Sequence, residues 1–179
     1  TILDGVSQSL GPIATGKGLQ FKVVPSSTFI ETDPHMLERI VHNFATNAYS
    51  YTDAGQILIG CRHQGEDLRI EVWDTGIGIS EHDLVSIFDE FHRLSDARRD
   101  GHSTLGLGLS IVKVLSEGLN HQVDVRSLLG RGSVFSVTVP KGEALAAQPM
   151  AIQMEDTSLS GVKILIVDDD RLSRSGILE

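Results

Sequence analysis

Residues 33–51, DPHMLERIVHNFATNAYSY, carry the clearest structural pattern in the chain. Asp33 followed by Pro34 is typical of a helix start, with an N-cap residue and a proline in the first turn. Apolar residues then recur at every third or fourth position, which predicts an amphipathic helix over residues 34–51. Its apolar face consists of Leu37, Ile40, Val41, Phe44 and Ala48.

Short runs rich in β-branched and aromatic residues surround this helix, and turn-forming residues separate them. They predict strands at residues 19–24, 28–31, 56–62, 68–73, 123–127 and 133–139. Further helices are expected as a short one within residues 1–17, a short one from Ser80 to Phe88, and an amphipathic one at 107–119. Helices mixed with adjacent hairpins predict an α+β fold, in which helices cover one face of a mixed, mostly antiparallel sheet.

The composition and net charge of the chain exclude several classes of function. The chain has 179 residues, enough for a real core, and its 15 Lys and Arg against 24 Asp and Glu give a net charge of −9. Such a chain is a poor nucleic-acid binder, because phosphate affinity rests on clustered basic side chains. The only cysteine, Cys61, excludes an internal disulfide and a thiolate-rich metal site. With no apolar run near the ~20 residues of a spanning helix, we expect a cytoplasmic location, with any membrane anchor of a parent protein lying elsewhere.

Two polar patterns are candidate binding elements. Asn43, Asn47 and Tyr51 follow one another at intervals of four residues and so share one helix face. Two amide oxygens on one face can coordinate Mg²⁺ together with substrate phosphates, although a solvated face beside a buried aromatic ring is the alternative. In residues 74–78, DTGIG, a carboxylate at a strand end precedes glycines that allow close approach of a ligand, which suits an amine such as that of adenine. An ordinary turn between a strand and a helix is the alternative there.

A third pattern, residues 106–110 (GLGLS), opens a predicted helix. Free backbone N–H groups and the helix dipole make such a start a phosphate site, although two glycines alone are weak evidence. The polar segment 92–105 contains three arginines and is predicted to be a long loop. Because the three patterns occur in order, with this loop between the second and the third, they favour a nucleotide site.

Two other patterns are rejected as sites. Residues 11–17, GPIATGK, match the spacing of a P-loop, but Gly18 stands where Ser or Thr should bind Mg²⁺, and a strand follows instead of a helix. His82 beside Asp83 could be imagined as a phosphate acceptor, but an ordinary surface histidine at a helix start is the favoured interpretation.

Five segments together resemble the motifs of sensor histidine kinases, in the order of that family. They are residues 43–48 (NFATNA, N box), 74–78 (DTGIG, G1 box), 87–91 (IFDEF, F box), 106–110 (GLGLS, G2 box) and 130–133 (GRGS, the last glycine motif). The resemblance covers roughly residues 30–140. It implies the ATP-binding catalytic domain of the GHKL superfamily, which is a two-layer α/β sandwich.

The resemblance also implies roles for the matching residues. Asp74 would accept a hydrogen bond from the adenine amine, Tyr51 would pack against the base, and Asn43 with Asn47 would hold the Mg²⁺ of Mg-ATP. Arg93 would reach the phosphates from a lid, and Asn43 and Arg93 would be the catalytic residues. The other nucleotide-binding positions that it implies are Gly76, Gly78, Ile79, Phe88, Gly106, Leu107, Gly108 and Leu109.

The chain departs from the family pattern at two positions. Ser50 stands where the family often has Lys or Arg, and Thr104 stands where the G2 box commonly begins with another glycine. Both departures are expected to affect catalytic efficiency more than nucleotide binding. Arg98 and Arg99 would supply the missing positive charge.

Residues 163–170, KILIVDDD, resemble the first strand of a response-regulator receiver domain, with Asp168 and Asp169 as its acidic pair. Four parts are therefore expected. They are the tail of a helical dimerisation region or a connecting helix (1–17), the ATP-binding catalytic domain (18–141), a linker (142–160) and the beginning of a receiver domain (161–179).

The resemblance implies a hybrid sensor histidine kinase, which transfers the γ-phosphoryl group of ATP to a histidine on a dimerisation domain outside this chain. A receiver domain or response regulator would accept the group next, and the full-length parent would be a homodimer. Two alternatives stay open. One is a nucleotide-binding regulatory module without kinase activity, which Ser50 and Thr104 favour, and the other is a different GHKL ATPase.

Overall fold

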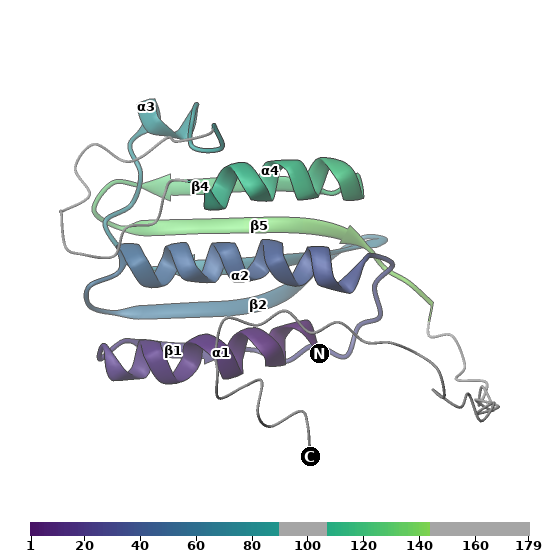
Figure 1. Cartoon of the computed structure of the whole chain (residues 1–179), viewed down its shortest axis with the longest axis horizontal. Helices are drawn as coiled ribbons and strands as arrows, with labels where there is room; N and C mark the ends of the chain where they lie inside the picture. The colour runs from purple at the N-terminus through teal and green to yellow at the C-terminus, as the bar shows by residue number, and fades with distance from the viewer. Residues whose placement is uncertain (90–106, 144–179) are drawn as a thin grey trace, which may run out of the picture. The chain divides into compact units, whose positions relative to one another are not determined.

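The computed structural model describes residues 1–89 and 107–143. Helices α1, α2 and α4 form one layer on one face of a five-stranded sheet, whose strand order is β1-β2-β3-β5-β4 (Figure 1). This confirms the predicted α+β sandwich with helices on one face. The elements are α1 (Ile2–Gly16), β1 (Gln20–Val23), α2 (Pro34–Tyr51), β2 (Gln56–Gln64), β3 (Asp67–Asp74), α3 (Glu81–Leu84), α4 (Gly108–Leu119), β4 (Gln122–Leu128) and β5 (Gly132–Pro140).

The sheet is mixed and mostly antiparallel, as predicted. β1 pairs with β2 in the parallel sense, and the pairs β2–β3, β3–β5 and β4–β5 are antiparallel. The strand β3 lies at the centre, and its register places Val72 opposite Ile59 on β2 and opposite Phe135 on β5. These three side chains point to the helical layer, so β3 is covered by α2 on this face.

The predicted helix α2 is confirmed in detail. The Asp33 side chain accepts a hydrogen bond from the backbone N–H of Met36 at 2.9 Å, and Pro34 occupies the first turn. The helix ends at Tyr51, as predicted. Its buried residues include every predicted apolar position, together with Ala45.

Three local predictions need correction. The strand expected at residues 28–31 is a single bridge between Ile30 and Lys141, because β5 ends at Pro140, which has no N–H to extend the ladder. The helix expected from Ser80 to Phe88 is regular only over Glu81–Leu84. The first helix is not short, since α1 runs for 15 residues in spite of Pro12 within it.

Burial explains the length of α1. Leu3, Val6, Leu10 and Ala14 lie along its buried side and belong to the same core as α2 and the sheet. At the end of α1, the ammonium of Lys17 donates hydrogen bonds to backbone carbonyls at the end of α2. Residues 1–17 accordingly belong to the compact unit that spans Thr1–Ala144. The functional division of the chain stays a prediction.

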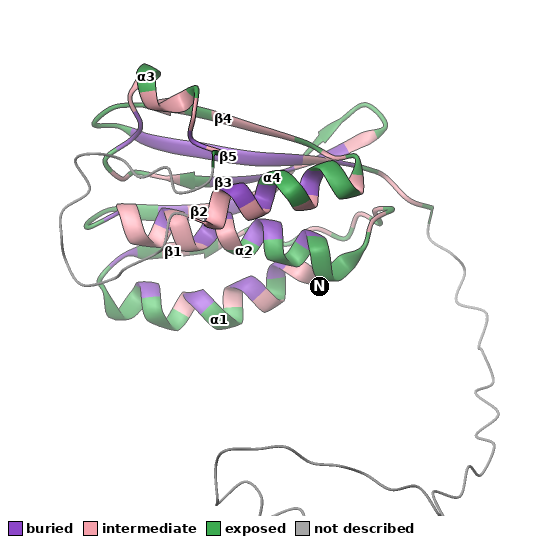
Figure 2. Cartoon of the chain, turned by 45° about the horizontal axis from the view of Figure 1, so that its top comes forward, coloured by how far each residue is buried: buried purple, intermediate pink, exposed green. Residues whose placement is uncertain are grey.

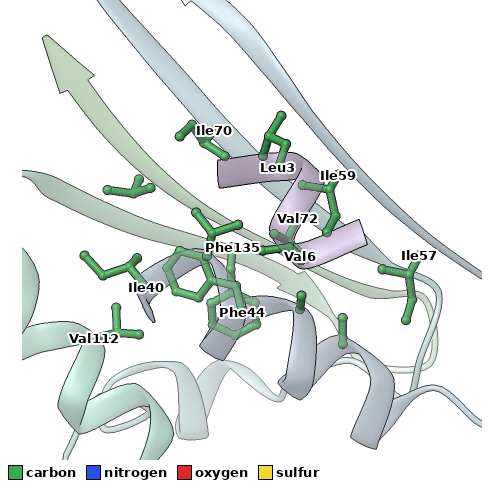
Figure 3. Close-up of a cluster of buried hydrophobic side chains, with 14 of the residues drawn as sticks. Leu3, Val6, Ile40, Phe44, Ile57, Ile59, Ile70, Val72, Val112 and Phe135 are labelled. Carbon is green, nitrogen blue, oxygen red and sulfur yellow. The ribbon is translucent and has the colours of Figure 1, made fainter. Parts of the chain in front are cut away.

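The core lies between the two layers. Buried residues recur along α1, α2 and α4 and occupy most of β5 (Figure 2). At its centre, the rings of Phe44 on α2 and Phe135 on β5 stack with centroids 5.4 Å apart, and Ile40 and Val112 lie beside them (Figure 3). None of the helices in the described ranges is long and apolar enough to cross a membrane.

Phe44→Ala is expected to lower the free energy of unfolding by about 3–5 kcal/mol, because it opens a cavity where a fully buried ring stacks on Phe135. Urea denaturation followed by circular dichroism measures this change. Met36→Ala on the exposed side of the same helix is the matched control, with an expected change within about 0.5 kcal/mol. Equal losses in the two variants would contradict a core centred on this ring pair.

Candidate functional site

One face of α2 carries Asn43, Asn47 and Tyr51, and all three residues are half-buried. The amide nitrogen of Asn43 donates a hydrogen bond to the carbonyl oxygen of Arg39 at 2.8 Å. This bond fixes the amide and leaves its oxygen, Oδ1, pointing away from the helix backbone. The orientation expected for a cation ligand is therefore present at Asn43.

The start of α4 meets these two amides. A Cβ atom placed on Gly108 would lie 3.0 Å from Oδ1 of Asn43 and 3.8 Å from Oδ1 of Asn47. The absence of a side chain at Gly108 thus allows the helix to begin directly beside both oxygens. Leu107 is the N-cap of α4, and its side chain caps no N–H group. The first turn of a 12-residue helix, with its positive dipole end, therefore lies next to two amide oxygens.

Asp74 ends β3 on the same side of the sheet as the helices. Its Oδ1 accepts a hydrogen bond from the backbone N–H of Gly76 at 2.8 Å, and the backbone N–H of Ser133 on β5 donates to the carboxylate as well. Burial raises the pKa of this carboxyl above its usual range, while the two backbone hydrogen bonds oppose the shift. Asp74 is thus a half-buried acceptor held by the backbone.

The loop after Asp74 is held between α2 and the β4–β5 hairpin. The N–H of Ile77 donates to the carbonyl oxygen of Tyr51, and a Cβ atom on Gly76 would lie 2.2 Å from that same oxygen. On the other side, the N–H of Gly130 donates to the carbonyl of Ile77, and Gly78 adopts a φ of 69° against Leu128. Gly76 therefore permits close backbone contact with the end of α2, and Gly78 permits it with the end of β4.

The remaining predicted positions divide into two groups. Ile79 is buried in the core, and Phe88 and Leu109 pack against that core while keeping part of their surface. Arg93 and Gly106 lie outside the described residues, as do Arg98, Arg99 and Thr104 and the proposed receiver segment.

Two serines that the sequence analysis did not assign also hold the site. The N–H of Ser133 donates to Asp74, and the hydroxyl of Ser127 on β4 accepts a hydrogen bond from the N–H of Ile79 at 2.8 Å. The two hydroxyl oxygens lie 2.9 Å apart. The GRGS motif could have identified Ser133 as a site residue, whereas no sequence pattern marks Ser127 as one.

These contacts distinguish two regions along the C-terminal half of α2. The helix rises about 1.5 Å per residue, so Tyr51 lies about 12 Å along the axis from Asn43. The C-terminal end at Tyr51 adjoins the Asp74 loop, and the middle of the helix at Asn43 adjoins the start of α4. This arrangement suits an elongated ligand that presents a hydrogen-bond donor at one end and a metal-bound anionic group at the other.

The family model described as histidine kinase-, DNA gyrase B- and HSP90-like ATPase matches residues 32–143. The chain belongs to this family. It is 35% identical over 171 residues to the autoinducer 2 sensor kinase/phosphatase LuxQ of Vibrio vulnificus (strain YJ016), a match that covers 89% of this chain and 20% of LuxQ. It is 30% identical over 165 residues to the aerobic respiration control sensor protein ArcB of Escherichia coli (strain K12), with 89% of this chain and 21% of ArcB covered.

Solved structures share the fold. Full-length ShkA in complex with AMPPNP matches with a TM-score of 0.67 and 32% identity, over 80% of this chain and 30% of the ShkA chain. The catalytic domain of the histidine kinase ThkA has a TM-score of 0.64 at 23% identity, over 78% of this chain and 91% of that domain. The chain spans about a fifth of the length of the two curated relatives, so it corresponds to one part of each.

Asp74→Asn tests the perturbed carboxyl. Because burial raises the pKa of Asp74 in the folded state, its ionisation destabilises the fold as the pH rises through that value. The variant is therefore expected to be at least as stable as the original chain at about pH 7, and this gain should shrink as the pH falls toward the unfolded-state pKa near 3.8. Thermal unfolding between about pH 4 and pH 7 measures the difference.

Asp67→Asn, which makes the same change of charge at the other end of β3, is the matched control. A variant at Asp74 that loses stability at neutral pH would contradict the analysis. In that case, the carboxylate would be stabilised more by its two backbone donors than it is destabilised by burial.

Proposed function

We propose that this chain is the ATP-binding catalytic part of a sensor histidine kinase, and that it positions Mg-ATP for transfer of the γ-phosphoryl group to a histidine on a dimerisation domain. The observation that carries this proposal is the meeting of the Asn43 and Asn47 amide oxygens at the start of α4, with Asp74 held at the far end of the same helix. The sensor kinases among the relatives support the same activity.

The Asp74 end is proposed to bind the adenine. The carboxylate already accepts two backbone N–H groups and still has lone pairs for the exocyclic amine of the base. Tyr51 at the end of α2 would pack against the ring, and Gly76 and Gly78 would keep the loop close to it. A buried acceptor discriminates against a base that lacks the amine, because the acceptor would then stay unpaired.

The region around Asn43 in the middle of α2 is proposed to hold the phosphates and Mg²⁺. Amide oxygens suit a hard cation, and because they are neutral, the triphosphate itself must supply most of the negative charge around the metal. When bound, Mg²⁺ would neutralise charge on the transferring group. The uncapped first turn of α4, with Leu107, Gly108 and Leu109, would donate N–H groups to the phosphates. Arg93 is proposed to add a positive charge, with Arg98 and Arg99 compensating for Ser50.

Phosphoryl transfer then requires mainly that the acceptor histidine be aligned with the γ-phosphorus of ATP. An imidazole nitrogen of the acceptor histidine forms a bond to the γ-phosphorus as the bond from that phosphorus to the bridging oxygen breaks, and ADP leaves. Positioning and charge stabilisation supply most of the rate in such reactions, so neutral ligands, an arginine and a helix start suffice on the nucleotide side. The acceptor histidine and the dimer contacts are proposed to come from other parts of a homodimeric parent.

The further assignments rest on the same proposal. A receiver domain or response regulator would take the phosphoryl group from the histidine, in a cytoplasmic phosphorelay. A regulatory module that binds ATP without transferring phosphate is the second candidate, and the specific observation in its favour is Ser50, a neutral residue where the family often has a cation.

Asn43→Ala and Asn47→Ala are each expected to weaken the binding of Mg-ATP by about tenfold or more, because each removes one oxygen ligand without filling its place. Isothermal titration calorimetry with ATP, in the presence and absence of Mg²⁺, measures this effect. Thr46→Ala on the same helix is the matched control, since its hydroxyl donates to the carbonyl of His42. Unchanged Mg-dependent affinity in both asparagine variants would refute the metal assignment.

Transfer itself is tested by mixing this chain with the separately produced dimerisation domain of its parent and ATP labelled at the γ-phosphate. We expect acid-labile label on that domain, and no label on this chain alone. The Asp74→Asn variant, with base binding weakened about tenfold to 100-fold, should transfer correspondingly less at low ATP concentration. Binding without any transfer would favour the regulatory module, and label on a histidine of this chain would refute the proposed division of roles.

A further inference from the structure

The face of the sheet turned away from the helices carries a cluster of charged and aromatic residues on β2, β3 and β4. Alternation along β3 points Arg69, Glu71 and Trp73 to this face, whereas Leu68, Ile70 and Val72 point to the core. Figure 1 shows α1, α2 and α4 all on the opposite side. The cluster is therefore separated from the proposed nucleotide site by the thickness of the sheet.

Glu71 is the centre of this cluster and is only 5% exposed. The indole N–H of Trp73 donates a hydrogen bond to its Oε2 at 3.0 Å. Guanidinium nitrogens of Arg69, Arg126 and Arg62 lie 3.2, 3.5 and 3.7 Å from its carboxylate oxygens. One indole N–H group and three guanidinium groups thus surround a buried carboxylate, whose two oxygens together offer about four lone-pair positions.

The positive charge of the cluster is not balanced. Arg69 is matched by Asp124, with Nη2 and Oδ2 2.8 Å apart, and it also lies near Glu71. Arg62 and Arg126 share what remains of the single Glu71 carboxylate, and their side chains stay 69% and 60% exposed. Three guanidinium groups against two carboxylates leave a formal charge of 3 − 2 = +1, on a chain whose net charge is −9.

A hollow of about 310 Å³ lies beside Arg62, and its walls include Val24, Leu58, Gly60 and Trp73 together with Arg62 and Glu71. Its volume is at the lower end of the range for sites that bind small organic molecules. A Cβ atom on Gly60 would meet only the Val24 side chain, at 3.5 Å, so the missing side chain at Gly60 leaves usable space. The indole of Trp73, 38% exposed, adds a flat apolar wall.

From this juxtaposition we infer that the outer face of β2 and β3 binds a small planar aromatic carboxylate. The ring system fills the space over Gly60 against Val24, Leu58 and Trp73. Its carboxylate pairs with the exposed guanidinium groups at the rim. A planar acid fits both parts, because guanidinium groups bind carboxylates through parallel N–H bonds and apolar walls favour a flat ring. The guanidinium of Arg126 lies 5.9 Å from the centre of the indole ring, so a positive charge is present beside this apolar wall.

The test uses 1-naphthoate as the probe and the chain's single tryptophan as the reporter. In a ¹⁵N-labelled sample, Trp73 gives one indole N–H signal, and this N–H donates to Glu71 within the cluster. We expect 1-naphthoate to shift the signal saturably, with a Kd of about 1 mM for a ligand of about a dozen non-hydrogen atoms. Acetate and 1-naphthalenemethanol, which each lack one half of the chemistry, should give no saturable shift at the same concentrations.

Two variants locate the bound probe. Arg62→Gln combined with Arg126→Gln should weaken binding about tenfold, and the control Arg39→Gln combined with Lys113→Gln removes equal charge from the helical layer and should leave the Kd unchanged. Gly60→Val fills the hollow at a position without positive φ and should abolish the saturable shift. The backbone amide spectrum of each variant checks that the fold is kept.

Competition with ATP separates this site from the proposed nucleotide site. Saturating Mg-ATP should leave the naphthoate titration unchanged, because the two ligands would occupy opposite faces of the sheet. The inference is overturned if naphthoate gives no saturable shift, if its Kd is the same in the Gly60 or the double-arginine variant, or if ATP displaces it. Failure of ATP to bind would contradict the proposed function and leave this inference intact.

Discussion

The rotational setting of α2 on the sheet is the constraint on which the rest of the site depends. Successive helix residues are turned by about 100°, so the side chain that faces the core decides where its neighbours point. Phe44 is fully buried against Phe135, and this contact turns the adjacent Asn43 to the edge of the core beside α4. Ile40 and Ala48 repeat the same setting one turn before and one turn after. The packing that stabilises the fold therefore also orients both amides.

Sequence patterns predicted the structure correctly where the local preferences of the residues agree with their burial in the fold. Asp33 and Pro34 start α2, the predicted apolar positions of that helix are all buried in the core, and Asn43 and Asn47 both lie beside Gly108. Sequence patterns failed where the length of a helix or strand depends on contacts with residues far away in the chain. Pro12 argued against a long first helix, yet four buried side chains on the core stabilise α1 past it. Residues 28–31 have the composition of a strand, but the strand beside them, β5, ends at Pro140. No pattern within residues 28–31 reveals where β5 ends.

Within the site too, sequence patterns predicted local features but missed contacts between distant residues. The role of Asp74 as an acceptor followed from a carboxylate at a strand end, but its support from Ser133 required the pairing of β3 with β5. Ser127 illustrates the limit most clearly. Its hydroxyl holds the N–H of Ile79 across 48 positions of sequence, and a serine in an edge strand carries no mark of that contact. The motifs identified the residues that we propose to contact the ligand, whereas the residues that support them lie on strands whose pairing only the fold reveals.

The central strand β3 links the two faces of the sheet. Asp74 points to the helical layer and the preceding residue, Trp73, points away from it, so a slip of one residue in register would exchange the Asp74 carboxylate for an indole. Glu71 opposes such a slip, because on the core face its charge would lose the three guanidinium groups that surround it. Leu68, Ile70 and Val72 oppose it from the other side through burial. The ionic cluster on the outer face therefore helps to fix the position of the carboxylate on the inner face, independently of any ligand that the cluster binds.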